Sequence, residues 1–149
     1  MRMPDVNILV YAHREESPQH AVCARWLGGI ATGPEPFALS ESVLHGFVRI
    51  VTNGRIFNPP SSPAQAFRFV DALLDRPHCV IIRPGPKHWE IFRDLCTKAG
   101  ARAKLVADAA HAALAIESGC EWVTADTDFA RFAPRLRWQH LSGQPRPLG

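Results

Sequence analysis

Long apolar stretches are missing from this sequence, and so are the cysteine patterns of zinc-binding and secreted domains. No run of 18 or more apolar residues occurs, which argues against a membrane span. The start lacks a basic region followed by an apolar core, so we expect no secretion signal. The four cysteines show no Cys-x-x-Cys spacing, and we expect buried thiols in a reducing cytoplasm, with neither disulfides nor a zinc site.

A large net charge is also absent, because the chain carries only +3, but its charges are unevenly distributed. Residues 49–104 contain ten Lys or Arg and four Asp or Glu, a balance of +6, and the other residues contain seven and ten, a balance of −3. This asymmetry is compatible with a basic surface beside an acidic pocket, as in nucleic-acid-binding proteins. A solvated helical face would give the same counts.

The length of 149 residues and the apolar content of 46% indicate a single domain over residues 1–149, with a loose tail from about 142 to 149. Apolar runs predict a strand before Asp5, strands at 37–39, 79–82 and 122–124, and an edge strand within 136–141. Helical spacing predicts helices over 17–30, 41–51, 63–74, 86–99 and 105–118. This alternation predicts a parallel sheet with helices on both faces.

Five acidic residues lie at comparable junctions of this predicted fold. Asp5 follows the first strand, Glu41 follows the second, Asp108 lies near the start of an alanine-rich helix, and Asp126 and Asp128 follow the 122–124 strand. The carboxyl ends of parallel strands share one edge of a sheet, where these carboxylates can converge. Clustered carboxylates must raise their pKa values or bind a cation, and oxygen ligands suit Mg²⁺ or Mn²⁺. The pattern predicts phosphodiester hydrolysis assisted by a metal.

Each of these acids also has a purely structural interpretation. Asp5, Asp126 and Asp128 are common capping or turn residues, and Glu41 suits the positive end of a helix dipole. Asp108 is harder to explain in this way, because its apolar neighbours predict a largely buried helix start. The joint placement of the acids favours the functional interpretation.

The ordered motifs resemble the signature of PIN-domain ribonucleases and are most similar to the VapC toxins of bacterial toxin–antitoxin pairs. The motifs are Asp5-Val6-Asn7, Glu41, Leu105-Val106-Ala107-Asp108-Ala109 and Thr124-Ala125-Asp126-Thr127-Asp128-Phe129, and the likeness extends from about residue 3 to 141. It implies an α/β fold of the PIN type, a three-layer α/β/α sandwich with a mostly parallel central sheet. It also implies a Mg²⁺- or Mn²⁺-dependent endoribonuclease, the toxin of a type II pair, with an RNA substrate, a cognate VapB-like antitoxin and a homodimeric state.

The resemblance also assigns roles to individual residues. The implied catalytic metal ligands are Asp5, Glu41, Asp108 and Asp126, with Asp128 as a further metal-site carboxylate and Asn7 and Thr124 as supports. The spacing of the last turn varies in the family, so the motif does not decide whether Asp126 or Asp128 lies closer to the metal.

Four basic or titratable residues near these acids allow two interpretations each. Arg49 and Arg55, on and just after the helix that begins at Glu41, are predicted to contact RNA phosphates, unless they only solvate an exposed face. His45 and His111 share helical faces with acids. They are either proton donors or RNA contacts, or else packed or surface side chains. The four tryptophans are expected in the core.

Two other functions compete with the nuclease. A haloacid-dehalogenase-like or receiver-like phosphotransfer domain also has Asp after its first strand, but the dehalogenase type needs a second Asp where this chain has Asn7. A non-catalytic binding module with a vestigial PIN site fits less well, because every signature position carries its acid.

Overall fold

A computed structural model of the chain describes residues 1–142 of the 149. The loose tail expected from about 142 therefore lies almost entirely outside the described residues. The strands are β1 (Arg2–Pro4), β2 (Phe37–Ser40), β3 (Cys79–Ile82), β4 (Glu121–Thr124) and β5 (Trp138–His140). The helices are α1 (Val6–His13), α2 (His20–Thr32), α3 (Glu41–Val51), α4 (Pro63–Leu74), α5 (His88–Ala99), α6 (Lys104–Ser118) and the 3₁₀ helix η1 (Thr127–Phe132).

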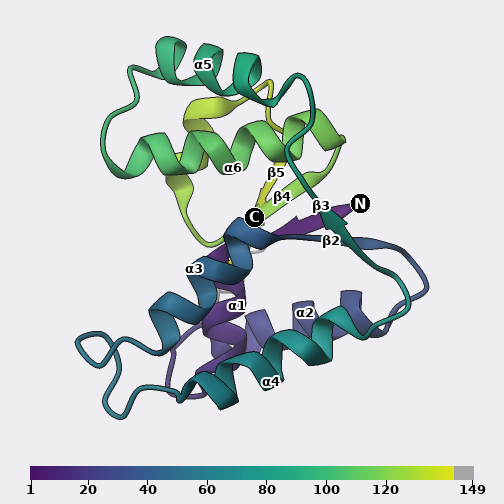
Figure 1. Cartoon of the computed structure of the whole chain (residues 1–149), viewed down its shortest axis with the longest axis vertical. Helices are drawn as coiled ribbons and strands as arrows, with labels where there is room; N and C mark the ends of the chain where they lie inside the picture. The colour runs from purple at the N-terminus through teal and green to yellow at the C-terminus, as the bar shows by residue number, and fades with distance from the viewer. Residues whose placement is uncertain (143–149) are drawn as a thin grey trace, which may run out of the picture.

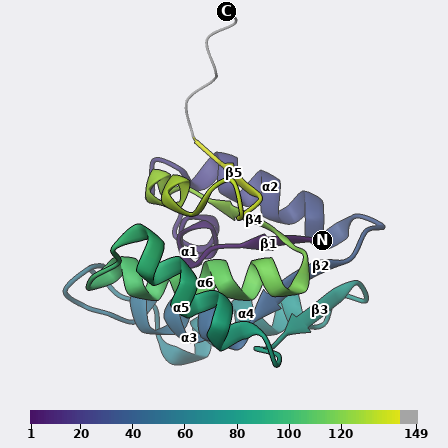
Figure 2. The same ribbon diagram turned by 90° about the horizontal axis from the view of Figure 1, so that it is seen from above.

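The five strands form one sheet in the order β3-β2-β1-β4-β5, and every neighbouring pair is parallel. Helices α5 and α6 lie on one side of the strands, with α1, α2 and α4 on the other (Figure 1). In the view from above, α5 and α6 are nearest the viewer (Figure 2). The predicted α/β architecture with a parallel central sheet is confirmed.

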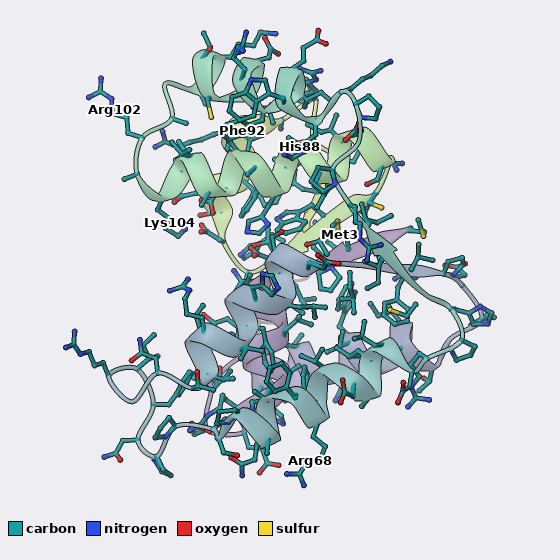
Figure 3. The ribbon with its side chains drawn as sticks, viewed as in Figure 1. Met3, Arg68, His88, Phe92, Arg102 and Lys104 are labelled. Atoms are coloured by element: carbon teal, nitrogen blue, oxygen red, sulfur yellow. The ribbon has the colours of Figure 1, made fainter. Side chains whose placement is uncertain are left out.

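The core fills the space between the sheet and its helices. Trp122 on β4, Phe37 on β2 and Met3 on β1 are fully buried. Figure 3 labels Met3 beside the strands. Helix α6 contributes small side chains, Ala109, Ala112, Ala113 and Ala115, which allow it to lie close against its neighbours. No helix among residues 1–142 is both long and apolar enough to cross a bilayer.

Local sequence signals explain several helix ends. The Ser40 hydroxyl accepts the Val43 N–H at 3.2 Å and caps α3. Ser62 and Gln65 form a reciprocal capping box at the start of α4. Gly100 closes α5 with φ 59°, a conformation that glycine adopts without steric strain.

Other local expectations are wrong. Strand β3 is an edge strand, and Val80 is 37% exposed, although its apolar run is typical of a buried strand. Trp89 on α5 is 63% exposed and so lies outside the core. Two of the four cysteines, Cys79 and Cys96, are only half-buried, and all four are free thiols.

Candidate active site

The pairing of β1 with β4 brings together two side chains that are far apart in the sequence. Pro4 is in register with Val123, and the Asp5 N–H donates to the Val123 carbonyl at 2.8 Å. The Thr124 hydroxyl donates to Asp5 Oδ2 at 2.6 Å, and the Val6 N–H donates to Asp5 Oδ1 at 2.6 Å. Asp5 therefore caps α1 and is also held at the carboxyl end of β1, so a structural role and a functional role are compatible.

Asn7 and Thr124 link the start of α1 to the turn after β4. Asn7 Nδ2 donates to Thr124 Oγ1 at 3.3 Å, and Asn7 Oδ1 accepts the Ala125 N–H at 3.2 Å. The same Thr124 oxygen accepts the Asp126 N–H at 3.0 Å. An aspartate at position 7 has no N–H to offer Thr124, so the amide is the side chain that completes this network.

Two further carboxylates share one ammonium group beside Asp5. Lys104 Nζ lies 2.7 Å from Asp126 Oδ2 and 3.3 Å from Asp108 Oδ2. Lys104 lies at the start of α6, whereas Arg102 in the preceding loop points outward (Figure 3). A positive charge thus lies between carboxylates from α6 and from the turn after β4.

Burial, hydrogen bonds and neighbouring charges shift the pKa values of these acids. Burial raises the pKa of Asp5 from 3.8 to about 6, and the negative charges of Asp108 and Asp126 add to the rise, while its hydrogen bonds oppose it. Burial likewise raises the pKa of Asp108, in part against the charge of Lys104. For Asp126, burial acts upward, but hydrogen bonds from Lys104 and the Asp128 N–H outweigh it and lower the pKa.

These acids border a cleft of about 630 Å³, a size typical of ligand-binding sites. Its acidic side contains Asp5, Asp108 and Asp126 with Lys104. The rest of its lining comes from α1, α3, the turn after α3, α6 and the turn after β4: Val6, Asn7, Val10, Tyr11, Arg49, Ile50, Ile56, Phe57, Ala107, His111, Ala125 and Thr127.

The backbone just before Lys104 is strained. Ala103 has φ 51° and ψ −124°, a region that residues with a Cβ rarely occupy. Such a conformation costs on the order of 1–3 kcal/mol and persists where the surroundings enforce it. The strain lies immediately before the lysine that pairs with both acids.

The profile of the PIN domain matches residues 2–134. The chain belongs to the PIN-domain family. It is 48% identical over 141 residues to Ribonuclease VapC43 of Mycobacterium tuberculosis, and the aligned region covers 94% of this chain and 95% of the relative. It is 41% identical over 133 residues to Ribonuclease VapC25 of the same species, covering 89% and 94%.

A solved structure shows the same PIN-domain fold. The crystal structure of VapBC2 from Rickettsia felis bound to a DNA fragment from its promoter matches with a TM-score of 0.70 and 22% identity. The match covers 95% of this chain and 98% of that chain. The likeness in fold therefore spans nearly the whole chain.

Not every acid predicted for this PIN domain borders the cleft. Glu41 begins α3 as predicted, but its carboxylate is exposed and lies 2.8 Å from Arg83, outside the cleft lining. Asp128 is also exposed, and it contributes its backbone N–H to Asp126 Oδ1 at 2.9 Å. In the described residues 1–142, no three Asp, Glu, His or Cys side chains already form a metal-binding cluster.

The predicted arginine and histidine contacts also divide into residues that line the cleft and residues that do not. Arg49 lines the cleft, and its side chain has no partner among the described residues, whereas the exposed Arg55 does not line it. His111 lines the cleft and stacks on Trp122 with ring centroids 5.4 Å apart, and burial lowers its pKa to about 4. His111 is therefore neutral at pH 7. His45 is exposed on α3 and lies outside the cleft lining.

Sequence reasoning missed two features of this site. Lys104 was not singled out, although its spacing of four residues before Asp108 on one helix predicts an ion pair. The aromatic residues Tyr11 and Phe57 line the same cleft as the acids. Nothing in their local sequence distinguishes them from core residues, because their placement depends on how α1 and α3 pack.

Proposed function

We propose that this chain is the endoribonuclease toxin of a type II toxin–antitoxin pair and hydrolyses RNA phosphodiester bonds with Mg²⁺ or Mn²⁺. The observation that supports the chemistry most strongly is the buried Asp5 carboxylate, which shares a cleft with Asp108 and Asp126. The relatives named as ribonucleases, 48% and 41% identical over nearly the whole chain, support the substrate class.

The donor set fits a hard divalent cation. Oxygen ligands are what Mg²⁺ and Mn²⁺ prefer, and the ammonium between Asp108 and Asp126 already marks a position where positive charge is favourable. The Lys104 side chain is 70% exposed, so it can swing out and leave these carboxylates to an ion. When bound, such an ion polarises a phosphoryl oxygen and lowers the pKa of a water ligand.

Glu41 fits the same site only after a rearrangement. Its ion pair with Arg83 joins side chains that are 56% and 67% exposed, and exposed pairs contribute at most about 1 kcal/mol. Glu41 lies at the carboxyl end of β2, next to β1. We propose that it leaves Arg83 and joins Asp5 when the metal site forms, with Asp128 acting at most through water.

The remaining cleft residues orient the reactants. Thr124 and Asn7 fix the Asp5 carboxylate, which limits the reorganisation needed to bind an ion. The unpaired guanidinium of Arg49 is placed to hold an RNA phosphate at the cleft. Arg55 lies outside the cleft lining, and its proposed role is to contact a phosphate of the RNA farther from the cleft.

Cleavage of total cellular RNA by the purified protein tests this function. Activity should disappear in excess chelator, return with Mg²⁺ or Mn²⁺, and leave 5′-phosphate and 3′-hydroxyl ends. Asp5→Asn should remove it, whereas Asp71→Asn, which neutralises an exposed acid on α4, should not. Full activity in chelator would refute the metal requirement, and 2′,3′-cyclic phosphate ends would identify the ribose hydroxyl as the nucleophile. Hydrolysis of aryl phosphates without RNA cleavage would favour a phosphotransfer domain.

We also propose a VapB-like antitoxin as the partner and a homodimer as the active assembly. The support for the partner is that the matching solved structure is a VapBC assembly. Co-expression with a VapB-like antitoxin should suppress RNA cleavage and yield a complex that co-purifies. Light scattering on the toxin alone should give twice the chain mass of 16.5 kDa, and a mass of one chain would exclude the homodimer.

A further inference from the structure

The cleft has an apolar side that metal-assisted hydrolysis does not require. Val10, Tyr11, Ile50, Ile56 and Phe57 border the same cleft as the carboxylates, and Ile56 is 54% exposed. We call these five residues the apolar wall. Of the five, only Ile56 is exposed, Tyr11, Ile50 and Phe57 are half-buried, and Val10 is buried. Ligand clefts commonly join such an apolar lining to a few polar groups, and the apolar part contacts the ligand.

The aromatic part of the apolar wall is held in place before any ligand binds. The Arg14 guanidinium lies 4.4 Å from the centroid of the Phe57 ring. Arg14 itself is fixed by hydrogen bonds to Ser61 Oγ at 3.0 Å and to the Pro59 carbonyl at 2.9 Å. The Phe57 N–H donates to the Asn53 carbonyl at 3.0 Å, so both backbone and ring are constrained. A ring fixed in this way loses little freedom when a planar ligand stacks on it.

The wall lies beside the acids along α1. Tyr11 is six residues beyond Asp5, which corresponds to roughly 9 Å along a helix axis. Arg49 and Ile50 are adjacent on α3, so an unpaired guanidinium borders the wall. The Tyr11 hydroxyl has no hydrogen-bond partner among residues 1–142 and is available to a ligand. The cleft thus combines carboxylates, a cation and an apolar aromatic surface.

We propose that the apolar wall is a nucleobase subsite, on which a base next to the scissile phosphate stacks against Phe57 and Tyr11 while Arg49 holds the adjoining phosphate. This inference rests on the proposed nuclease function and adds the part of the substrate that the cleft recognises. Base–aromatic stacking tolerates any base, and the Tyr11 hydroxyl can add a hydrogen bond to a base edge. The subsite gives the apolar side of an acidic cleft a role in binding the substrate.

The test measures binding of a labelled single-stranded RNA by fluorescence anisotropy in an Asp5→Asn background, in which the RNA stays intact. Phe57→Leu keeps apolar bulk but removes the aromatic face, and we expect about tenfold weaker binding. Phe57→Trp should bind at least as tightly as the parent. Phe67→Leu, a matched change of a 53% exposed phenylalanine outside the cleft lining, should have no effect.

A second RNA separates stacking from a structural role. An oligomer of the same length with abasic sugars keeps the phosphates but has no bases, so Phe57→Leu should not weaken its binding. If Phe57→Leu fails to fold, as judged by circular dichroism, Tyr11→Leu against Tyr11→Phe provides the same comparison. Equal loss for both oligomers, or no loss for either, would overturn the subsite.

The outcomes also distinguish this inference from the proposed function. If the wild-type protein cleaves no RNA but the base-dependent loss is seen, the subsite stands and the nuclease proposal fails. If RNA binding is unchanged while Phe57→Leu weakens binding of a VapB-like antitoxin, the wall serves a protein partner and the nucleobase subsite is wrong.

Discussion

Replacing Asp5 by Asn should stabilise the metal-free protein at neutral pH, although it removes a predicted metal ligand. The rise in the pKa of Asp5 from 3.8 to about 6 means that its ionisation disfavours the folded state. A rise of this size corresponds to about 3 kcal/mol once both folded and unfolded states are ionised. Asparagine has no charge and escapes this term.

The amide of Asn at position 5 also loses a hydrogen bond that the carboxylate makes. Thr124 donates its hydroxyl hydrogen to Asp5 and already accepts from Asn7 and Asp126, so an amide nitrogen at position 5 would leave that hydrogen unpaired. The lost hydrogen bond costs about 1 kcal/mol. The expected gain at neutral pH is therefore about 2 kcal/mol in the free energy of unfolding.

The pH dependence isolates the charge from the hydrogen bond. Because the pKa of a carboxyl group is raised in the folded state, the wild-type protein loses stability as pH rises from 3.8 to about 6. The advantage of Asp5→Asn should grow by about 1 kcal/mol between about pH 5 and about pH 7.5. Urea unfolding in excess chelator measures this difference.

The control is Asp71→Asn, whose effect on the free energy of unfolding should be small, because Asp71 is exposed on α4. The reasoning would be refuted if Asp5→Asn were less stable than wild type at about pH 7.5, or if its advantage did not change with pH. A loss of stability would mean that the two hydrogen bonds accepted by the Asp5 carboxylate, of which an amide can accept only one, outweigh the cost of its charge.

Three further variants test the rest of the site. Asp126→Asn should reduce RNA cleavage and Mn²⁺ affinity by larger factors than Asp128→Asn, because of the two only Asp126 borders the cleft. Initial rates of cleavage and calorimetric titration with Mn²⁺ measure both factors, and the reverse order in folded variants would make Asp128 the metal ligand. Lys104→Met should tighten Mn²⁺ binding, because it removes the cation that pairs with Asp108 and Asp126. The free energy of unfolding should change by less than about 1 kcal/mol, since the lysine is 70% exposed. Weaker Mn²⁺ binding would show that the lysine supports the metal site. Ala103→Gly should raise the free energy of unfolding by about 1 kcal/mol, because glycine accepts φ 51° without strain; a loss in urea unfolding would contradict this strain.

The fold was largely predictable because its signals are local. Ser40, Ser62 and Gly100 mark helix ends by chemistry within a few residues, and short apolar runs mark the strands. Exposure was less predictable, since the apolar run of β3 does not reveal that β3 is the outermost strand on its side of the sheet within residues 1–142. A glycine near a helix end is not a sufficient signal: Gly54 follows α3 and suits a left-handed closing residue, but Thr52 is the C-cap and Gly54 has no positive φ.

The candidate site was predictable in part for the same reason. Parallel pairing of β1 with β4 places Asp5 beside Thr124, and the rule that strand ends converge needs no knowledge of side-chain rotamers. Which way a carboxylate points does depend on rotamers and on partners from other elements. Arg83 follows β3, 42 residues after Glu41, and no motif links the two. The roles of Glu41 and Asp128 therefore stay predictions.

The acids of the cleft differ in how freely they can rearrange around an ion. Asp5 makes three hydrogen bonds to two elements: it caps α1 at Val6, donates its backbone N–H to Val123 of β4 and accepts from Thr124 of β4, so its carboxylate is fixed. Asp126 and Asp108 instead share an exposed lysine through one oxygen each, and Asp126 also accepts the Asp128 N–H through its other oxygen. Exchange of that lysine for an ion needs only side-chain rotation, whereas movement of Asp5 would disturb the sheet edge. We therefore expect ion binding to proceed by adjustment of the other carboxylates around a stationary Asp5, which is why the charge of Asp5 should dominate both metal affinity and the instability of the metal-free protein.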